Sequence, residues 1–258
     1  MKKRIRLKVA YDGTDFFGWQ KQPNEDQTIQ GILEKHLSQI YNEPISVVGS
    51  GRTDRGVHAL AQWAHCDLPK RRDHSNLQYK LQRMTPETLS ILRVEDAPGD
   101  FHAQISAVSK CYRYQIQVAP TPSPFQRLYS WQRKKPLSLN YLQQASKCLL
   151  GGHDFTSFQS KGTEVSSPVR ELLVSRWREP KRGHFHYQIQ GNGFLKQMVR
   201  NIVGTLIDLH DAGAPPEAIS EILGAQDRQR ASAPAPASGL FLASVQYPEI
   251  LDNKCRKL

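Results

Sequence analysis

The chain is organised around one short stretch, Gly51-Arg52-Thr53-Asp54-Arg55-Gly56-Val57-His58-Ala59. It stands between two β-like runs, and its glycines permit a positive φ and the close approach of another backbone, so we expect a tight, shaped loop. Within it the Asp54 carboxylate lies between the guanidinium groups of Arg52 and Arg55, which favour its ionised form. An ionised Asp is a poor general acid but a serviceable nucleophile. By itself the pattern fits a turn-capping Asp with solvated arginines equally well.

The charge balance points to a polyanionic partner. The formal net charge is +11 over 258 residues, an excess that enzymes of small metabolites rarely need and that a nucleic-acid partner explains. Because the basic residues are spread along the predicted strands and loops, we expect a basic face on a folded body. A basic amphipathic helix of the kind that binds membrane surfaces is missing from the pattern.

Composition also limits the cellular setting. No apolar run approaches the roughly 20 residues that cross a bilayer, and the basic N-terminus leads into alternating residues instead of a signal-peptide core. We therefore expect a cytoplasmic protein. The four cysteines are widely spaced without a C-x-x-C pair, which favours reduced thiols over a zinc site or a disulfide framework.

Hydrophobic periodicity predicts the elements. Alternation over 4–10 and 110–118 predicts strands, and a 3.6-residue period over 28–40 predicts an amphipathic helix. Further predicted elements are strands at 45–48, 60–68, 89–94, 172–177, 185–189 and 239–247, and helices at 138–150, from Gly191-Asn192-Gly193 onward, and 215–224.

These elements predict an α+β fold, with two related halves sharing a central, largely antiparallel sheet and helices on one face. A basic cleft between the halves is the expected place for substrate. The expected divisions are an N-terminal half at 1–118, a Pro-rich connector at 119–137, a C-terminal half at 138–248 and a mobile basic tail at 249–258.

Most common catalytic signatures are missing. The chain has no G-x-x-x-x-G-K-[ST] or G-x-G-x-x-G motif for a nucleotide cofactor and no G-x-S-x-G for acyl transfer. His184 and His186 share a strand face, but without carboxylate companions a solvated pair is favoured over a metal site. What remains is an ionised Asp with arginines and aromatics on a basic protein. This combination suits chemistry at the anomeric carbon of a nucleoside whose base is drawn out of its stack.

A resemblance to a known family rests on short motifs that occur in order along the chain. They are Tyr11-Asp12-Gly13-Thr14, Phe17-Gly18-Trp19-Gln20, Gly51–Ala59, Phe101-His102-Ala103, Lys110-Cys111-Tyr112-Arg113-Tyr114, His153-Asp154-Phe155, Met198-Val199-Arg200-Asn201-Ile202-Val203-Gly204 and Gly239-Leu240. Together they resemble the TruA family of tRNA pseudouridine synthases, over nearly the whole chain. The Gly51–Ala59 loop is the most specific of them.

The resemblance implies an isomerase with the pseudouridine synthase fold. Such an enzyme detaches uracil from C1′ of a tRNA uridine, rotates it and rejoins it through C5. The resemblance implies action in the anticodon arm, at positions 38, 39 and 40, with no cofactor and no metal. It also implies a homodimer whose two subunits share one tRNA.

The resemblance also assigns site residues. Asp54 matches the catalytic aspartate, which either attacks C1′ or removes a proton from C2′. Tyr112 matches the tyrosine that packs on the target base and helps proton removal from C5, and Arg52 matches the arginine that helps displace the base. Arg200 matches an arginine that pairs with the catalytic carboxylate. A buried Arg beside an apolar helical stripe needs such an anionic partner.

The chain departs from the family pattern at three places: Arg55 stands where many members carry Ala, Gln104 stands where Arg is usual, and only the Pro is kept in the segment 81–87. Two rival functions also fit parts of the pattern. One is a non-catalytic tRNA-binding or chaperone protein on the same scaffold, which an Asp54→Ala variant that binds tRNA but has lost turnover would exclude. The other is a metal-dependent nuclease, which would lose activity in a chelator.

Overall fold

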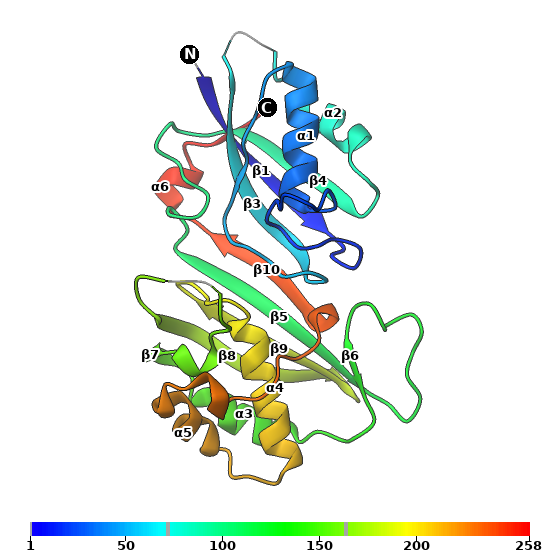
Figure 1. The fold of residues 1–258 in the computed structure, drawn as a ribbon, viewed down its shortest axis with the longest axis vertical. Coiled ribbons are helices and arrows are strands. Elements are labelled where there is room, and N and C mark those ends of the chain that lie inside the picture. Colours follow the sequence, from blue (N-terminus) through cyan, green and yellow to red (C-terminus); the bar gives the residue numbers. More distant parts are fainter. Residues whose placement is uncertain (1, 71–72, 163–164) are drawn as a thin grey trace. The chain divides into compact units, whose positions relative to one another are not determined.

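The computed structural model describes residues 2–70, 73–162 and 165–258. The chain divides into two compact units, of which unit 1 holds Met1–Val108 and Leu242–Leu258 and unit 2 holds Ser109–Phe241 (Figure 1). These boundaries differ from the predicted halves. The residues 109–118 group with unit 2 because they form a strand that pairs within it. The residues 242–258 group with unit 1, to whose sheet the C-terminal strand pairs.

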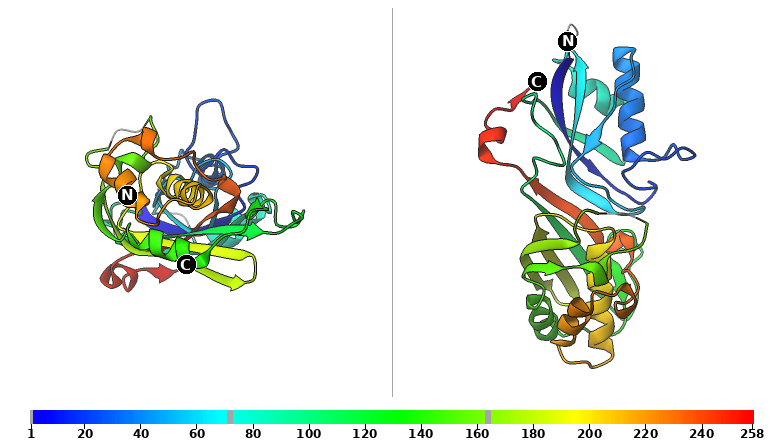
Figure 2. Two further views of the ribbon diagram at one scale, coloured as in Figure 1. Left: turned by 90° about the horizontal axis from the view of Figure 1, so that it is seen from below. Right: turned by 60° about the vertical axis from the view of Figure 1, so that its left-hand side comes forward.

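Unit 1 is built on antiparallel strands in the order β11-β4-β1-β3. The strands are β1 (Lys2–Tyr11), β2 (Val48–Gly49, on β3), β3 (His58–Pro69), β4 (Leu89–Asp96) and β11 (Arg256–Lys257), and the helices are α1 (Ile29–Tyr41), α2 (Leu77–Met84) and α6 (Glu249–Asp252). Helices α1 and α2 lie on one side of the strands and α6 on the other (Figure 2). Ile5, Leu7 and Val9 of β1 are fully buried, as the predicted alternation requires.

Helix α1 confirms the predicted amphipathic helix. The Thr28 side chain accepts from the Gly31 N–H at 3.2 Å and caps its first turn, and Asn42 ends it in the left-handed conformation. The predicted strand at 45–48 is wrong except at its last residue. The N–H groups of Ile45 and Val47 donate to α1 side chains, Ser38 and Glu34, and so do not enter a strand ladder.

Unit 2 has antiparallel strands in the order β5-β9-β8-β7, with a short parallel strand on β5. The strands are β5 (Ser109–Val118), β6 (Trp131–Arg133), β7 (Gly151–Asp154), β8 (Val169–Lys181) and β9 (His184–Gly191), and the helices are α3 (Leu139–Lys147), η1 (Thr156–Phe158), α4 (Met198–Asp211), α5 (Ala218–Ala225), η2 (Arg228–Arg230) and η3 (Ala237–Gly239). Strand β10 (Leu240–Gln246) carries the chain from unit 2 back into unit 1. Both units mix helices with largely antiparallel strands, which confirms the predicted α+β class.

The long helix of unit 2 begins later than predicted. Gly191 still belongs to β9, and Asn192 exchanges hydrogen bonds with the backbone of Glu171, its N–H donating to the Glu171 carbonyl. This ties the start of the turn to β8, so α4 starts at Met198, after Gln197 with φ of 58°. The apolar stripe predicted for the helix is buried, including Ile202 and Leu206.

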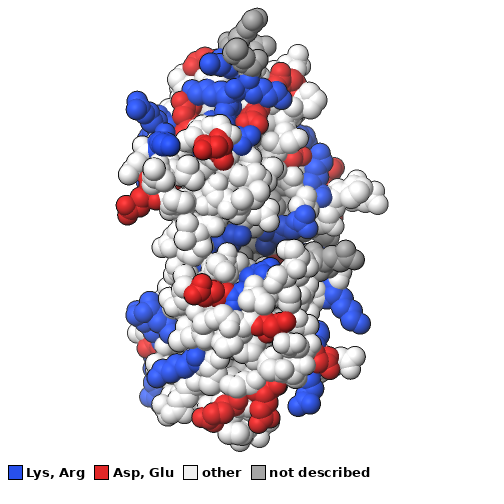
Figure 3. All heavy atoms as spheres, turned by 90° about the vertical axis from the view of Figure 1, so that its left-hand side faces the viewer, with Lys and Arg blue, Asp and Glu red and all other residues white. Residues whose placement is uncertain are grey.

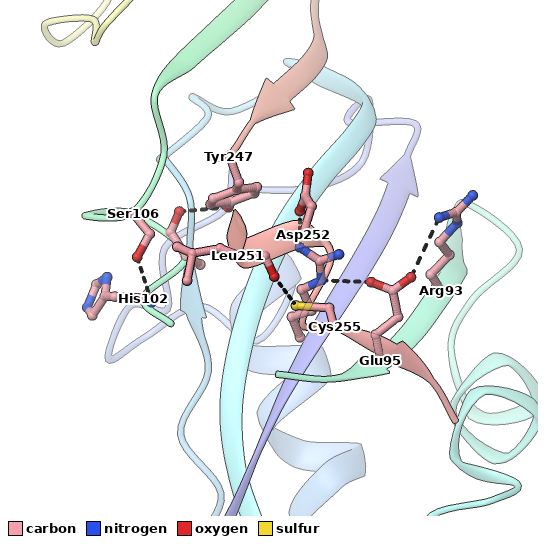
Figure 4. Close-up of polar contacts among 10 residues, drawn as sticks. Arg93, Glu95, His102, Ser106, Tyr247, Leu251, Asp252 and Cys255 are labelled. Atoms are coloured by element: carbon pink, nitrogen blue, oxygen red, sulfur yellow. Dashed lines mark hydrogen bonds and ion pairs between the residues drawn. The ribbon is translucent and has the colours of Figure 1, made fainter. Parts of the chain in front are cut away.

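The C-terminal tail, predicted to be mobile, folds onto unit 1. Asp252 of α6 pairs with Arg6 of β1, and the same guanidinium pairs with Glu95 at 2.7 Å (Figure 4). Arg6 is 5% exposed, and its guanidinium lies 4.4 Å from the ring centre of Trp63. The tail therefore covers the β1 face that alternation predicts to be solvent-facing.

On the face drawn in Figure 3, Lys and Arg side chains lie among Asp and Glu side chains and form no continuous basic surface. No helix in the described residues is long and apolar enough to span a bilayer.

Candidate active site

The Asp54 loop lies in unit 1 between β2 and β3, against the backbone of residues 11–20. The Trp19 N–H donates to the Thr53 carbonyl at 3.0 Å, and the Gly56 N–H donates to the Phe16 carbonyl at 3.3 Å. A turn closes on itself where the Val57 N–H donates to the Asp54 carbonyl at 3.1 Å. Backbone hydrogen bonds therefore hold the loop on both sides of Asp54.

Glycines in the neighbouring segment explain why two backbones fit so closely. A Cβ at Gly13 would lie 2.0 Å from the Val57 carbonyl oxygen, and one at Gly18 would lie 2.6 Å from that of Thr53. Gly18 also has φ of +90°, which L side chains rarely adopt. The glycines of the two N-terminal motifs are thus needed to support the Asp54 loop.

Hydrogen bonds from buried polar side chains also hold the loop in place. The Tyr11 hydroxyl and Thr53 Oγ1 share a hydrogen bond of 2.9 Å, and burial raises the pKa of Tyr11, which keeps the phenol neutral. The fully buried Gln62 donates to the Gly51 carbonyl at 2.7 Å and accepts from the Ser50 hydroxyl. Tyr11 thus connects β1 to the loop, and Gln62 connects β3 to it.

Sequence reasoning missed these supporting residues. Tyr11 lies in one of the ordered motifs, as does His58, whose Nδ1 accepts from the Gly13 N–H at 3.0 Å. A motif signal therefore existed for both. For Gln62 the only signal was its polar side chain within the strand predicted at 60–68, where His65 and Asp67 are polar as well.

The three charged side chains of the loop have different surroundings. Asp54 is half-buried, whereas Arg52 and Arg55 are exposed. The Arg55 guanidinium lies 3.9 Å from the ring centre of Phe17, a cation–π contact. Arg55, the residue that departs from the family pattern, thus packs on the aromatic segment that supports the loop.

Tyr112 lies in unit 2, on β5. Its ring is buried and meets the edge of Phe194 at 5.0 Å with an interplanar angle of 83°. Phe194 belongs to the turn between β9 and α4. The same face of β5 carries Lys110, two positions earlier, because side chains on a strand alternate between faces.

Arg200 lies in the first turn of α4 and is half-buried. Its Nε donates to the Ala235 carbonyl at 2.7 Å, and the hydroxyl of Tyr114 donates to the neighbouring Pro236 carbonyl at 2.8 Å. A Cβ at Gly204 would lie 2.1 Å from the Ala233 carbonyl oxygen. The helix motif that contains Arg200 and Gly204 therefore packs closely against residues 233–236, which precede β10.

The structure thus brings Asp54 and Arg52 together in one loop of unit 1, and places Tyr112 and Arg200 in unit 2. The pairing of Arg200 with the Asp54 carboxylate stays a prediction. No three His, Cys, Asp or Glu side chains gather as a metal site in the part of the chain that the structure describes.

Comparison with known proteins shows the family to which the chain belongs. A family model described as tRNA pseudouridine synthase matches residues 8–104 and 145–248, which is more than half of the chain. The chain belongs to this family. Its members are isomerases, and this chain is one. The matched residues include the Asp54 loop and Arg200, whereas Tyr112 falls between the matched segments.

Full-length relatives agree with the family model. The chain is 45% identical to "tRNA pseudouridine synthase A" of Bdellovibrio bacteriovorus, over 100% of both chains. It is 41% identical to "tRNA pseudouridine synthase A 1" of Protochlamydia amoebophila, over 97% of this chain and 98% of the relative. It is 38% identical to "tRNA pseudouridine synthase A" of Streptococcus gordonii, over 95% of this chain and 99% of the relative. The alignment with the first of these relatives covers the whole chain and therefore includes Tyr112.

Proposed function

We propose that this chain converts uridine to pseudouridine at positions 38, 39 and 40 of tRNA, with Asp54 as its catalytic residue. The bond between uracil N1 and C1′ breaks, the base rotates, and a bond from C5 to C1′ forms. The C5 proton leaves and N1 gains a proton, so substrate and product are isomers.

The observation that carries the role of Asp54 is the way its loop is held. The flanking backbone of Thr53 and Gly56 is hydrogen-bonded to residues 11–20, and two glycines allow the contact. A catalytic group acts well when its support is fixed before substrate arrives. A turn-capping Asp with solvated neighbours would not need this support from two strands and a second loop.

The other site residues take roles that the family pattern suggests. Tyr112 packs on the target base and assists proton removal from C5, and Arg52, exposed beside Asp54, helps to displace the base. Arg200 pairs with the Asp54 carboxylate. The enzyme acts as a homodimer in the cytoplasm, on tRNA, without cofactor or metal.

The experiment uses tRNA transcripts that carry tritium at C5 of uridine, because the exchange of C5 for N1 releases that tritium to water. We expect wild type to release tritium with EDTA present, and Asp54→Ala and Asp54→Asn to bind tRNA but release none. Transcripts with cytidine at positions 38 to 40 should release none with wild type.

Each rival function has its own outcome in the same experiment. Tight binding of tRNA by wild type without tritium release would support a non-catalytic RNA-binding protein. Loss of turnover in EDTA together with shortened transcripts on a gel would support a metal-dependent nuclease. Release that persists in both Asp54 variants would refute the catalytic role of Asp54.

A further inference from the structure

Two basic side chains share a face of the unit 2 sheet with Tyr112. Gly191 pairs with Lys110 on one side and with Leu172 of β8 on the other, and directly opposite residues point to the same face. Arg170 lies two positions before Leu172 and so points to this face as well. Lys110 lies two positions from Tyr112, which is about 7 Å along a strand.

The surroundings of this pair are unfavourable to positive charge. Burial and, after it, the charge of Arg170 lower the pKa of Lys110 to about 8, and burial lowers the pKa of Arg170. No carboxylate forms an ion pair with either side chain among residues 2–70, 73–162 and 165–258. Two like charges that lose water without an anion between them cost folding free energy.

The guanidinium of Arg170 keeps donors available. One of its terminal nitrogens donates to the carbonyls of Ser167 and Val169, at 2.8 and 2.6 Å. Its Nε faces Gly193, where a Cβ would lie only 3.3 Å away. A side chain there would press on the guanidinium, so the glycine allows this turn to lie close to Arg170.

The same turn connects the pair to the base-binding tyrosine. Gly193 contacts Arg170, and the next residue, Phe194, meets the ring of Tyr112 at 5.0 Å. A nucleotide whose base lies on Tyr112 would therefore have its backbone close to Lys110 and Arg170. The anion that accompanies a nucleotide base is the phosphodiester.

We propose that Lys110 and Arg170 bind one phosphate of the tRNA backbone beside the target uridine. The proposal rests on the proposed function, because the base is placed by Tyr112. The phosphate receives charge-assisted hydrogen bonds from the ammonium and the guanidinium, and it supplies a negative charge that no carboxylate of the described residues gives to this pair through an ion pair. Phosphate contacts of this kind fix register and carry no base preference, so the pair acts as a positioning element.

The test compares Lys110→Gln and Arg170→Gln with a control, Lys147→Gln, which removes an exposed lysine from α3 of the same unit. The dissociation constant for tRNA is measured at several salt concentrations. The logarithm of the association constant falls linearly with the logarithm of the salt concentration. For a single-stranded loop, the loss of one phosphate-binding cation decreases the magnitude of that slope by about 0.7. We expect that decrease and about tenfold weaker binding for the two site variants, and no change of slope for Lys147→Gln.

Thermal unfolding of the free protein separates binding from structure. Lys110→Gln removes a like-charge repulsion, so we expect its Tm to rise while its affinity for tRNA falls. An unchanged salt slope in both site variants, or a fall of Tm that parallels the loss of affinity, would overturn the proposal. The binding measurements are repeated with Asp54→Ala protein, so a failure of catalysis does not affect them, and the same decrease of slope there supports the phosphate site by itself.

Discussion

A Cβ atom at Gly18 would lie 2.6 Å from the carbonyl oxygen of Thr53, the residue immediately before Asp54. The two segments are joined again at the next residue, where the Trp19 N–H donates to that same oxygen at 3.0 Å. The position of the carboxylate in the chain's most specific motif therefore depends on a glycine more than 30 residues earlier.

Gly18→Ala should displace the Asp54 loop. The added methyl group would meet a backbone carbonyl, and the alanine would have to adopt a φ of +90°. We therefore expect a loss of roughly 1–3 kcal/mol in the free energy of unfolding and a strong fall in kcat. Urea unfolding and tritium release measure the two effects. Gly99→Ala is the control, because a Cβ there meets nothing within 4 Å. Wild-type activity in Gly18→Ala would show that the loop tolerates displacement.

Tyr112→Phe tests the hydroxyl without removing the ring. The ring contact with Phe194 should survive, so we expect tRNA affinity within about twofold of wild type. The proposed role in proton removal from C5 predicts a rate lower by about 10²-fold or more, measured as tritium release in a single turnover. Tyr79→Phe, which alters an exposed tyrosine on α2, is the control. An unchanged rate would mean that only the ring contributes.

His65 should make unit 1 sensitive to acid. Its buried Nδ1 accepts from the Ala103 N–H at 3.1 Å, and burial, assisted by Arg4 and His102 and opposed by Asp67, lowers its pKa to about 4. The folded protein thus holds this imidazole neutral, while the unfolded chain protonates it near pH 6.5.

Since the unfolded state binds more protons between these values, stability is complete above pH 6.5 and falls as the pH approaches 4. At pH 5 the contribution of His65 should be lower by about 2 kcal/mol than at pH 7. His65→Gln should lose that part of the pH dependence in urea unfolding, and His36→Gln should keep it. An equal slope in His65→Gln and wild type would assign the acid sensitivity to other groups.

Glu95 distinguishes a buried ion pair from an exposed one. It pairs with Arg6 at 2.7 Å, where both side chains are less than 10% exposed, and with Arg93 at 3.5 Å, where the arginine is 59% exposed (Figure 4). Glu95→Gln leaves a buried guanidinium with Asp252 alone, so we expect a loss of roughly 3 kcal/mol.

Arg93→Gln breaks only the exposed pair and should cost less than about 1 kcal/mol. Urea unfolding measures both variants. If both variants lost the same free energy of unfolding, the burial of Arg6 would add nothing to the contribution of its ion pair with Glu95.

Elements whose signals are local could be predicted from the sequence. Helix α1 follows from the Thr28 cap and a regular apolar period, and β1 follows from strict alternation. The start of α4 could not be predicted, because it depends on hydrogen bonds between Asn192 and Glu171, which are distant in sequence. The C-terminal tail was misjudged for the same reason, since Asp252 meets Arg6 only after the sheet of unit 1 has formed.

The chemistry that this protein offers could be inferred from its residues alone: an Asp between arginines in a glycine-bounded loop, on a basic α+β chain whose ordered motifs place it in its family. The folded chain was needed to show what holds that Asp in place, and that Lys110 and Arg170 share a face with Tyr112. Residue types and local periods can be read along the chain. The backbone contacts at Gly13 and Gly18, and the like charges on β5 and β8, which β9 separates, arise from packing between segments far apart in sequence.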